Sequence, residues 1–376
     1  MRSEVRTAIV LGGVIAVGLA VASIAFTALD SEPASTVAAG VDPDAPQSSQ
    51  AVDKSRFKMA PDLVGIADYL NTTPEELEAR IGDSVVLYDI WTYSCINCLR
   101  TLPYITAWDE KYADQGLLII GVHSPEFEFE KDVDNVRRAV EKHGIEYPVV
   151  LDNDWETWDA FENRYWPRKY VADHEGYVRY DRIGEGGYQE TERVIQKLLA
   201  ERAAALGVQA AAAEPLVDID EFQHTAFRTP ELYFGYYFAQ NRNNLGSSEG
   251  FNPGQTIEYE RPGSVEHNKF YMVGTWTNGR DGMSLPDGED GSVLLKYSAK
   301  EVNIVTAGAG VIRVLVDGAP ISADIAGHDV DSDTGLITTD EPRLYNVVSA
   351  ESSSTHEIEL QIDNGGGFEM FTFTFG

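Results

Sequence analysis

The chain has 376 residues, of which 43% are hydrophobic, so it is long enough for two or three domains that each bury a core. Its 61 acidic residues against 29 basic ones give a formal net charge of −32. This charge argues against nucleic acid as a partner and against electrostatic binding to anionic lipid. We interpret the acidic composition as an adaptation to high salt, although an ordinary soluble extracytoplasmic protein can also be acidic.

The N-terminus predicts a membrane anchor. Thr7 to Leu29 is an uncharged and mainly apolar run of 23 residues, which as a helix of about 1.5 Å per residue spans a hydrocarbon core of roughly 30 Å. Arg2 and Arg6 precede it and acidic residues follow, so residues 1–6 are predicted to be cytoplasmic and the rest of the chain extracytoplasmic. A cleaved signal peptide is the alternative. Residues 30–57 lack a hydrophobic period and are predicted to be a disordered linker.

Residues 58–206 are predicted to form an α/β domain. Apolar runs typical of buried strands cover 85–91, 117–122 and 147–151, and another strand with a returning partner is expected after Pro167. Segments with helical signals lie between them, and this alternation favours a sheet with parallel strands and right-handed crossovers. Helices are expected over 74–80, from Asn97 onward, over 132–142, over 155–165 and up to Leu206.

The only two cysteines of the chain form a Cys-x-x-Cys motif where the first of these strands runs into a helix. Free N–H groups at a helix N-terminus stabilise a thiolate, so Cys95 is predicted to attack and Cys98, one turn along, to close the disulfide. The context favours a redox-active dithiol that needs no other cofactor. A structural disulfide over so short a loop would stabilise little, and a structural zinc site would need four ligands.

Side chains near the motif are further candidates. Trp91, Tyr93 and Trp166 are expected to form an apolar, substrate-binding rim around the sulfurs, although each is equally compatible with ordinary core packing. Glu126 and His123 fall at the C-terminal end of a predicted strand, where ligands and active residues collect in α/β proteins. We therefore consider that either of them tunes the dithiol, with a solvated loop residue as the alternative.

The segment Trp91–Tyr104, which reads WTYSCINCLRTLPY, resembles the thioredoxin-like domain of the DipZ-type proteins, relatives of the TlpA and ResA thioredoxins. In thioredoxins a buried acid lies six residues before the first cysteine and a proline five residues after the second, which matches Asp89 and Pro103. The resemblance implies that Asp89 takes the proton of Cys98 when that thiol attacks the mixed disulfide. It also implies that Pro167 is a cis proline beside the motif and leaves the backbone free to pair with a substrate strand.

A second domain is predicted over residues 228–376, after a linker over 207–227. Short strands separated by Asp-Gly and Asn-Gly turns, with no long helix, are typical of an all-β sandwich of the jelly-roll kind. The strands are expected over 231–238, 268–276, 292–297, 301–305, 311–318, 343–348, 355–362 and 368–375.

The resemblance to DipZ-type proteins continues in this second part, through Thr229–Tyr236 and the closing Phe-Thr-Phe-Gly. It implies a carbohydrate-binding-module fold, but a shared fold does not carry function. A scaffold or substrate-docking role is therefore favoured over glycan binding. Glycan binding would use exposed aromatic and amide side chains, for which the candidates are Tyr236, Tyr237, Asn241 and Asn243.

Two acidic candidates have competing explanations. Glu185, in a segment that also matches the DipZ pattern, lies near the predicted active site or is simply a turn residue. The acids of Asp329–Gly335 alternate as in a calcium loop, but the glycine falls one place late. A solvated acidic turn is favoured there, and no metal site is predicted.

Together these features predict a membrane-anchored, extracytoplasmic thiol:disulfide oxidoreductase that exchanges electrons with protein thiols and disulfides. The resemblance favours a reductase in cytochrome c maturation or disulfide repair, although the direction depends on the reduction potential. DipZ-type proteins carry a multi-span CcdA-like electron conduit, whereas one span is predicted here, so a separate membrane donor is expected. A thiol peroxidase on the same fold and a non-catalytic cell-surface binding protein are the alternatives.

Overall fold

The computed structural model describes residues 53–209, 215–224, 228–240 and 242–376. The predicted N-terminal anchor and most of the predicted linker lie outside the described residues. Asp53–Gly376 forms one compact unit, and none of its described helices is both long and apolar enough to cross a membrane. Residues 53–57 of the predicted linker are described, and Lys54 Nζ lies 3.0 Å from a carboxylate oxygen of Asp173.

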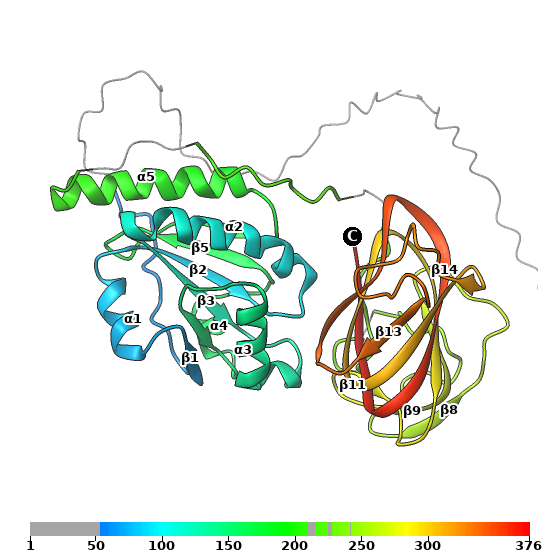
Figure 1. The fold of residues 1–376 in the computed structure, drawn as a ribbon. Coiled ribbons are helices and arrows are strands. Elements are labelled where there is room, and N and C mark those ends of the chain that lie inside the picture. Colours follow the sequence, from blue (N-terminus) through cyan, green and yellow to red (C-terminus); the bar gives the residue numbers. More distant parts are fainter. Residues whose placement is uncertain (1–52, 210–214, 225–227, 241) are drawn as a thin grey trace, which may run out of the picture. The chain divides into compact units, whose positions relative to one another are not determined.

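The α/β part is built on a six-stranded sheet with the order β1-β4-β3-β2-β5-β6 (Figure 1). The three central strands β4, β3 and β2 are parallel, as predicted, and the other three pair antiparallel. The edge strand β1 was not expected from the sequence. The strands are β1 (Asp68–Leu70), β2 (Val85–Trp91), β3 (Leu117–His123), β4 (Val149–Leu151), β5 (Arg168–Ala172) and β6 (Val178–Ile183).

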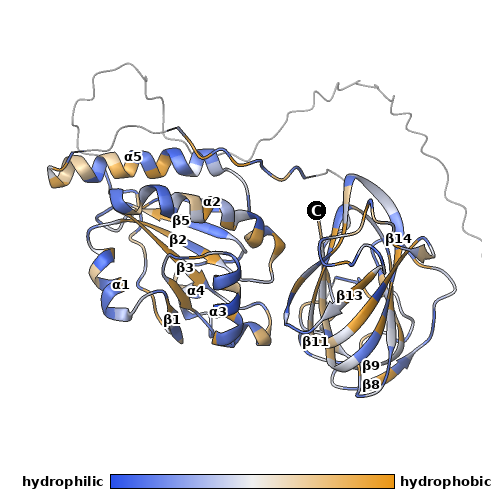
Figure 2. Cartoon of the chain, in the orientation of Figure 1, coloured by the Kyte–Doolittle hydropathy of each residue, from blue (hydrophilic) through white to orange (hydrophobic). Residues whose placement is uncertain are grey.

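Helices cover both faces of this sheet, and every residue of β2 is buried between them. Successive side chains point to opposite faces of a strand, so Leu87 packs with α2, α3 and α5 whereas Tyr88 packs with α1 and α4. Figure 2 shows hydrophobic residues along the strands and mixed hydropathy along α5. The helices are α1 (Pro74–Ile81), α2 (Ile96–Tyr112), α3 (Val133–Lys142), α4 (Glu156–Ala160) and α5 (Tyr188–Leu206), with short 3-10 turns η1 (Ala113–Gln115) and η2 (Glu128–Lys131).

The helix termini follow local sequence signals in two cases. The Thr73 hydroxyl accepts a hydrogen bond from Glu76 N, and Pro74 takes the first helical position of α1. The helix expected over 155–165 is shorter, because Glu162 adopts a φ of +51° that an α-helix cannot continue.

The second part is all β, as predicted, but its strands are longer than expected. An antiparallel sheet has the order β12-β11-β14-β10-β9-β8, in which β11 spans 26 residues and β14 spans 33. Residues 302–306 of β11 pair with two arms of β14, residues 343–348 and 370–375. The strands are β7 (Leu232–Tyr233), β8 (Thr256–Tyr259), β9 (Phe270–Asn278), β10 (Met283–Ser284), β11 (Gly291–Val316), β12 (Ala319–Pro320), β13 (Leu336–Thr339) and β14 (Arg343–Phe375).

Glycines let these long strands bend where the sequence suggested that they end. Gly308 has a φ of +79°, and a Cβ on it would lie 2.0 Å from the carbonyl oxygen of Gly367. A side chain at this position would therefore collide with the partner strand, whereas glycine allows the pairing to shift register at a bulge. Of the strand expected over 231–238, only Leu232–Tyr233 is formed. The jelly-roll topology stays a prediction.

Aromatic side chains join the two parts of the compact unit in what we call the interface cluster. Phe127, from the segment after β3, packs on Phe371 of β14 with ring centroids 5.1 Å apart, and Phe129 lies 4.7 Å from the same ring. The cluster consists of Phe127, Tyr233, Ala239, Val305 and Phe371, with Phe129, Phe238, Phe251, Ala307 and Leu344 packed against it.

The interface cluster predicts a stability effect. Phe371→Ala removes a ring that is only 4% exposed, so we expect it to lower the free energy of unfolding by about 3 kcal/mol, as for other buried Phe-to-Ala changes. Chemical denaturation of the full chain measures this. Val311→Ala, at a half-exposed position of β11, is the control and should cost less than about 1 kcal/mol. Equal losses for the two variants would show that the cluster adds little to stability.

Candidate active site

The two cysteines lie where β2 leads into α2, as the sequence predicted. Cys95 is the N-cap of α2, and its Sγ accepts a hydrogen bond from Cys98 N at 3.4 Å. Cys95 is half-buried and Cys98 is 1% exposed, and both are free thiols. Pro103 lies inside the same helix. One sulfur is therefore accessible to a partner, while the other is shielded one turn along the helix.

Burial makes the inner thiol a poor nucleophile at rest. Loss of hydration, together with the hydrogen bond and charge of Cys95, raises the pKa of Cys98 well above its ordinary value, and the negative charge of Asp89 acts in the same direction. Only a thiolate attacks a disulfide efficiently. Cys98 therefore needs a nearby group that accepts its proton.

We expect Asp89 to be this group, as the resemblance implied, and in the sheet it lies opposite Lys169. The two residues are direct partners in the antiparallel pairing of β2 with β5, and both are fully buried. Neither carboxylate oxygen of Asp89 has a hydrogen-bond partner among the residues that the structure describes. Burial raises the pKa of Asp89 to about 6, and the charge of Lys169 partly opposes this shift. At neutral pH the carboxylate is mostly ionised and ready to accept a proton.

Sequence reasoning missed Lys169. Its Nζ donates a hydrogen bond to the carbonyl oxygen of Gly184 at 3.1 Å. Burial lowers the pKa of Lys169 to about 8, although the charges of Asp89 and Cys98 act in the opposite direction. The sequence did contain a signal for Lys169. It lies two residues before Val171 and so shares the buried face of β5, where a lysine needs a partner.

Pro167 follows Trp166 through a cis peptide bond, as the resemblance implied. Trp166 is half-buried, and its indole Nε1 donates to the carbonyl oxygen of Ser124 at 2.9 Å. Its ring lies 4.3 Å from the ring of Trp158. Contacts within the α/β part therefore fix the position of Trp166, the residue before the cis proline.

The predicted aromatic rim is only partly present. Trp91 is fully buried and packs edge-on against His123, with centroids 5.4 Å apart. It therefore belongs to the core and not to a substrate-facing rim. Tyr93 is 4% exposed and stacks on the other side of His123, at 5.6 Å. Burial lowers the pKa of His123 to about 3, so this ring is neutral and serves packing.

The Glu126 side chain contacts the β part. Its Oε1 accepts a hydrogen bond from the Tyr233 hydroxyl at 2.7 Å, and Glu231 Oε2 lies at the same distance from that hydroxyl. Burial, and the charge of Glu231, raise the pKa of Glu126 well above its ordinary value. A direct role of Glu126 in the redox chemistry stays a prediction, and its contacts place it at the interface cluster.

A different acid, Glu130, holds the loop in front of Cys95. Its Oε1 accepts from the Ser94 hydroxyl at 2.5 Å, and its Oε2 accepts from the backbone N–H groups of Glu126 and Phe127 at 2.6 and 3.0 Å. Glu130 is fully buried. The sequence reading missed it, because nothing in the acidic run Glu126–Lys131 distinguishes one glutamate from another.

The remaining acidic candidates are engaged in ion pairs or turns. Glu185 pairs with His224 and lies 4.0 Å from Arg100, a residue of α2 that also contacts Glu301 of β11. Asp329 pairs with Arg343 at 2.8 Å. Each of the two carboxylates therefore lies beside a basic side chain.

Two of the predicted glycan-contacting residues share a cavity in the β part. Tyr236 and Asn243 line a space of about 600 Å³ together with Gln240 and Phe251. Tyr237 is exposed and lies under the guanidinium of Arg280, whose carbon is 4.2 Å from the ring centroid. The fourth candidate, Asn241, lies outside the described residues.

Comparisons with known proteins agree with this geometry. The AhpC/TSA family matches residues 58–181, and a family described as a thioredoxin-like C-terminal domain matches residues 229–376. The thiol-disulfide oxidoreductase YkuV of Bacillus subtilis is 34% identical over 143 residues, which cover 38% of this chain and 94% of YkuV. The chain belongs to the thioredoxin-like thiol-disulfide oxidoreductases.

Among these oxidoreductases the chain is also similar to DipZ. Protein DipZ of Mycobacterium bovis is 35% identical over 320 residues, which cover 84% of this chain and 43% of DipZ. The chain thus spans less than half the length of the DipZ protein that it matches. The solution structure of a thioredoxin-like protein in the oxidised form is 33% identical, covers 39% of this chain and 97% of its own, and has a TM-score of 0.35.

The raised pKa of Asp89 leads to a prediction about how the stability of the protein depends on pH. The pKa of about 6 in the folded protein exceeds the ordinary 3.8, so the folded state holds a proton that the unfolded state releases. This raised pKa costs stability as the pH rises through that window, by up to about 3 kcal/mol. We expect Asp89→Asn to remove the cost, so that its stability relative to the wild type increases between about pH 4 and pH 7. Denaturation curves across that range measure the difference, and parallel curves would contradict it.

Lys169 gives a second prediction. Its positive charge lowers the pKa of Asp89, so Lys169→Met should raise that pKa and leave less carboxylate to accept the proton of Cys98 at neutral pH. We expect closure of the disulfide in the variant to slow several-fold and to recover at higher pH. Stopped-flow measurement of the closure rate against pH tests this. A uniform slowing at every pH would instead indicate a structural effect.

Proposed function

We propose that Cys95 and Cys98 are the redox pair of this oxidoreductase and that the chain reduces disulfides of other proteins outside the cytoplasm. The observation that carries this proposal is the arrangement of the two thiols. A half-buried Cys95 caps a helix, and a buried Cys98 follows it, on which the charge of the buried Asp89 acts. Unequal exposure of two neighbouring thiols suits sequential attack, first on a partner and then within the motif.

The reaction proceeds in two exchanges. The Cys95 thiolate attacks one sulfur of the client disulfide, the client S–S bond breaks, and the leaving sulfur takes up a proton. The Asp89 carboxylate then accepts the proton of Cys98, whose sulfur attacks Cys95 in the mixed disulfide. The client leaves as a dithiol, and the two electrons that it has gained come from the Cys95–Cys98 pair, which is now a disulfide. Pro167 exposes the backbone on which the client strand is held.

The cellular setting is also proposed. The run Thr7–Leu29 anchors the chain in the membrane, and the catalytic part lies outside the cytoplasm. A CcdA-like membrane protein returns two electrons to the disulfide, and the clients belong to cytochrome c maturation or to disulfide repair. The likeness to DipZ and to the thiol-disulfide oxidoreductases supports this setting.

Trapping of mixed disulfides tests the function. Cys98→Ser removes the resolving thiol, so we expect the variant to accumulate covalent adducts through Cys95 when it meets disulfide-containing extracytoplasmic proteins. Mass spectrometry of adducts that dithiothreitol releases identifies them. Cys95→Ser is the matched control and should form none. Equal adduct formation by the two variants, or none by either, would overturn the proposal.

Two other functions are distinguished by their own readouts. The match to the AhpC/TSA family favours a thiol peroxidase as a second candidate, and rapid consumption of hydrogen peroxide by the reduced protein would support it. The cavity that contains Tyr236 and Asn243 favours a binding protein that holds a glycan. Oligosaccharide affinity that is unchanged in Cys95→Ser, without any redox activity, would support that candidate.

A further inference from the structure

A cavity lies between the two parts of the compact unit and is lined in part by neighbours of the dithiol in sequence. It has a volume of about 190 Å³ and is lined on one side by residues of α2 and α3 and on the other by residues of the β part. Tyr93 and Leu99 both line it. Tyr93 precedes Cys95 by two residues, and Leu99 directly follows Cys98. A segment in this cavity therefore contacts residues that flank the Cys-x-x-Cys motif in sequence.

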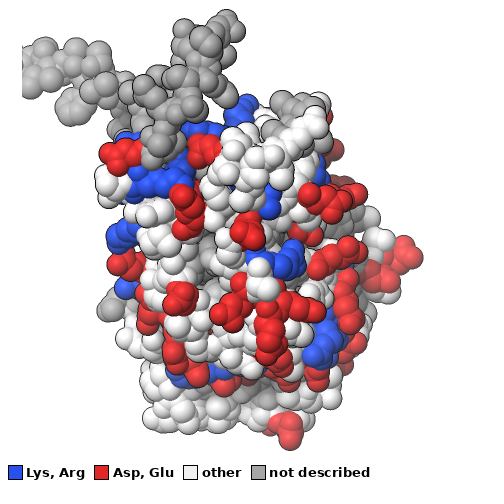
Figure 3. All heavy atoms as spheres, turned by 90° about the vertical axis from the view of Figure 1, so that its left-hand side faces the viewer, with Lys and Arg blue, Asp and Glu red and all other residues white. Residues whose placement is uncertain are grey.

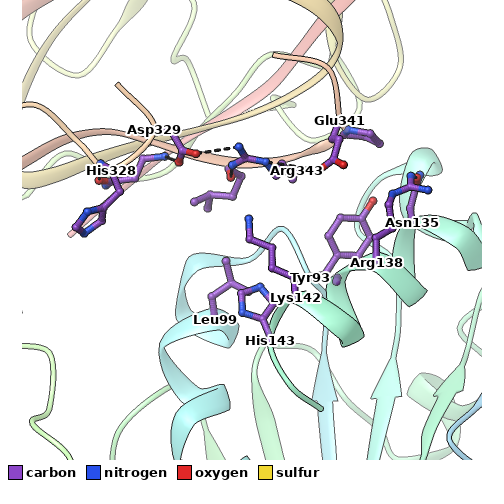
Figure 4. Close-up of a pocket in the computed structure, with 14 residues that line it drawn as sticks. Tyr93, Leu99, Asn135, Arg138, Lys142, His143, His328, Asp329, Glu341 and Arg343 are labelled. Atoms are coloured by element: carbon purple, nitrogen blue, oxygen red, sulfur yellow. Dashed lines mark hydrogen bonds and ion pairs between the residues drawn. The ribbon is translucent and has the colours of Figure 1, made fainter. Parts of the chain in front are cut away.

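Basic side chains converge on this cavity from both walls. Lys142 and Arg138 of α3 line one wall, and Arg343 at the start of β14 lines the other. Figure 4 shows Lys142 directed into the space toward the wall that carries Arg343. Two imidazoles, His143 and His328, also line the cavity, and burial together with the charge of Lys142 lowers the pKa of His143.

The acids nearby do not neutralise these bases fully. Asp329 pairs with Arg343 at 2.8 Å, and Glu341 lies 4.0 Å from the same guanidinium. Lys142 has no ion pair or hydrogen bond with any residue that the structure describes. Partial burial and the like charge of Arg343 lower the pKa of Lys142, and the charges of Asp329 and Glu341 oppose this shift only in part. A cation in this position gains from a carboxylate that approaches from outside.

A group of basic side chains around one cavity is unusual for this molecule, because its acidic residues outnumber its basic ones by 61 to 29. Figure 3 shows Asp and Glu side chains spread over the face that it draws, with fewer Lys and Arg. An acidic client is repelled by such a surface and attracted to this cationic cavity. Complementary charge of this kind selects clients and orients them.

We propose that the cavity binds an acidic segment of the client polypeptide, with a carboxylate between Lys142 and Arg343 while the client disulfide meets Cys95. This inference rests on the proposed function and names its substrate class. The β part thereby contributes one wall of the client site through Arg343. Lys142 acts as a specificity residue and not as a catalytic one.

Single-turnover reduction by the full, pre-reduced chain tests the proposal with three probes. Two are peptides of equal length with one disulfide, flanked by glutamates in the first and by glutamines in the second. The third is the uncharged hydroxyethyl disulfide. We expect the wild-type protein to reduce the glutamate peptide about tenfold faster than the glutamine peptide at low salt, and expect the ratio to shrink as salt is added.

Lys142→Glu should abolish or reverse this preference and leave the rate on hydroxyethyl disulfide unchanged. Lys142→Gln should give an intermediate ratio. Lys197→Glu is the matched control, because Lys197 is an exposed lysine on α5, and it should keep the wild-type ratio.

The outcomes separate this inference from the proposed function. Equal wild-type rates on the two peptides, with hydroxyethyl disulfide still reduced, would overturn the acidic-client inference alone. A reduction rate that falls by the same factor for all three probes in Lys142→Glu would also overturn the acidic-client inference, because Lys142 would then act on the fold or on the chemistry. If the wild type reduces none of the probes, the proposed function fails and the inference fails with it.

Discussion

The burial of a carboxyl and an ammonium group side by side, beneath two thiols, is the constraint on which the rest of the active site depends. Asp89 and Lys169 come from neighbouring strands, and neither reaches solvent. The charge of each residue shifts the pKa of the other, and both interact electrostatically with Cys98. The helices on both faces of the sheet keep water away from this pair, so the packing of the α/β part directly sets the proton affinity of the site.

The β part is more than an appended module, because it contacts the segments that carry the active-site loops. Phe127 and Phe129 pack on Phe371, and they are the N-cap and the second residue of the η2 turn that contains Glu130. Glu130 in turn holds Ser94, the residue before Cys95. A continuous set of contacts therefore links the β sheet to the loop that presents the reactive sulfur. Arg100 and Glu301 add a second link on the other side of the motif.

The sequence was informative where function depends on local pattern. The cysteine spacing, the strand before it and the N-cap position of Cys95 are all local, and the cis proline followed from the family resemblance. Lys169 was missed, because its role comes from the strand register that sets it opposite Asp89, 80 positions earlier in the chain. Glu126 was assigned to the redox site, yet its hydroxyl partner is 107 residues away in sequence. The long bent strands of the β part escaped prediction, because glycine bulges that bend a strand look like turns that end one.

The Glu126–Tyr233–Glu231 contact has a consequence for how the two parts hold together. The Tyr233 hydroxyl has a single hydrogen, but one carboxylate oxygen of each glutamate lies 2.7 Å from the phenol oxygen. Burial and the charge of Glu231 raise the pKa of Glu126 well above its ordinary value, so the assembled junction favours a proton on Glu126 that a hydrated glutamate would release. Acidity therefore tightens this junction and alkalinity loosens it, and any movement that parts the two halves is coupled to the release of one proton into the surrounding water.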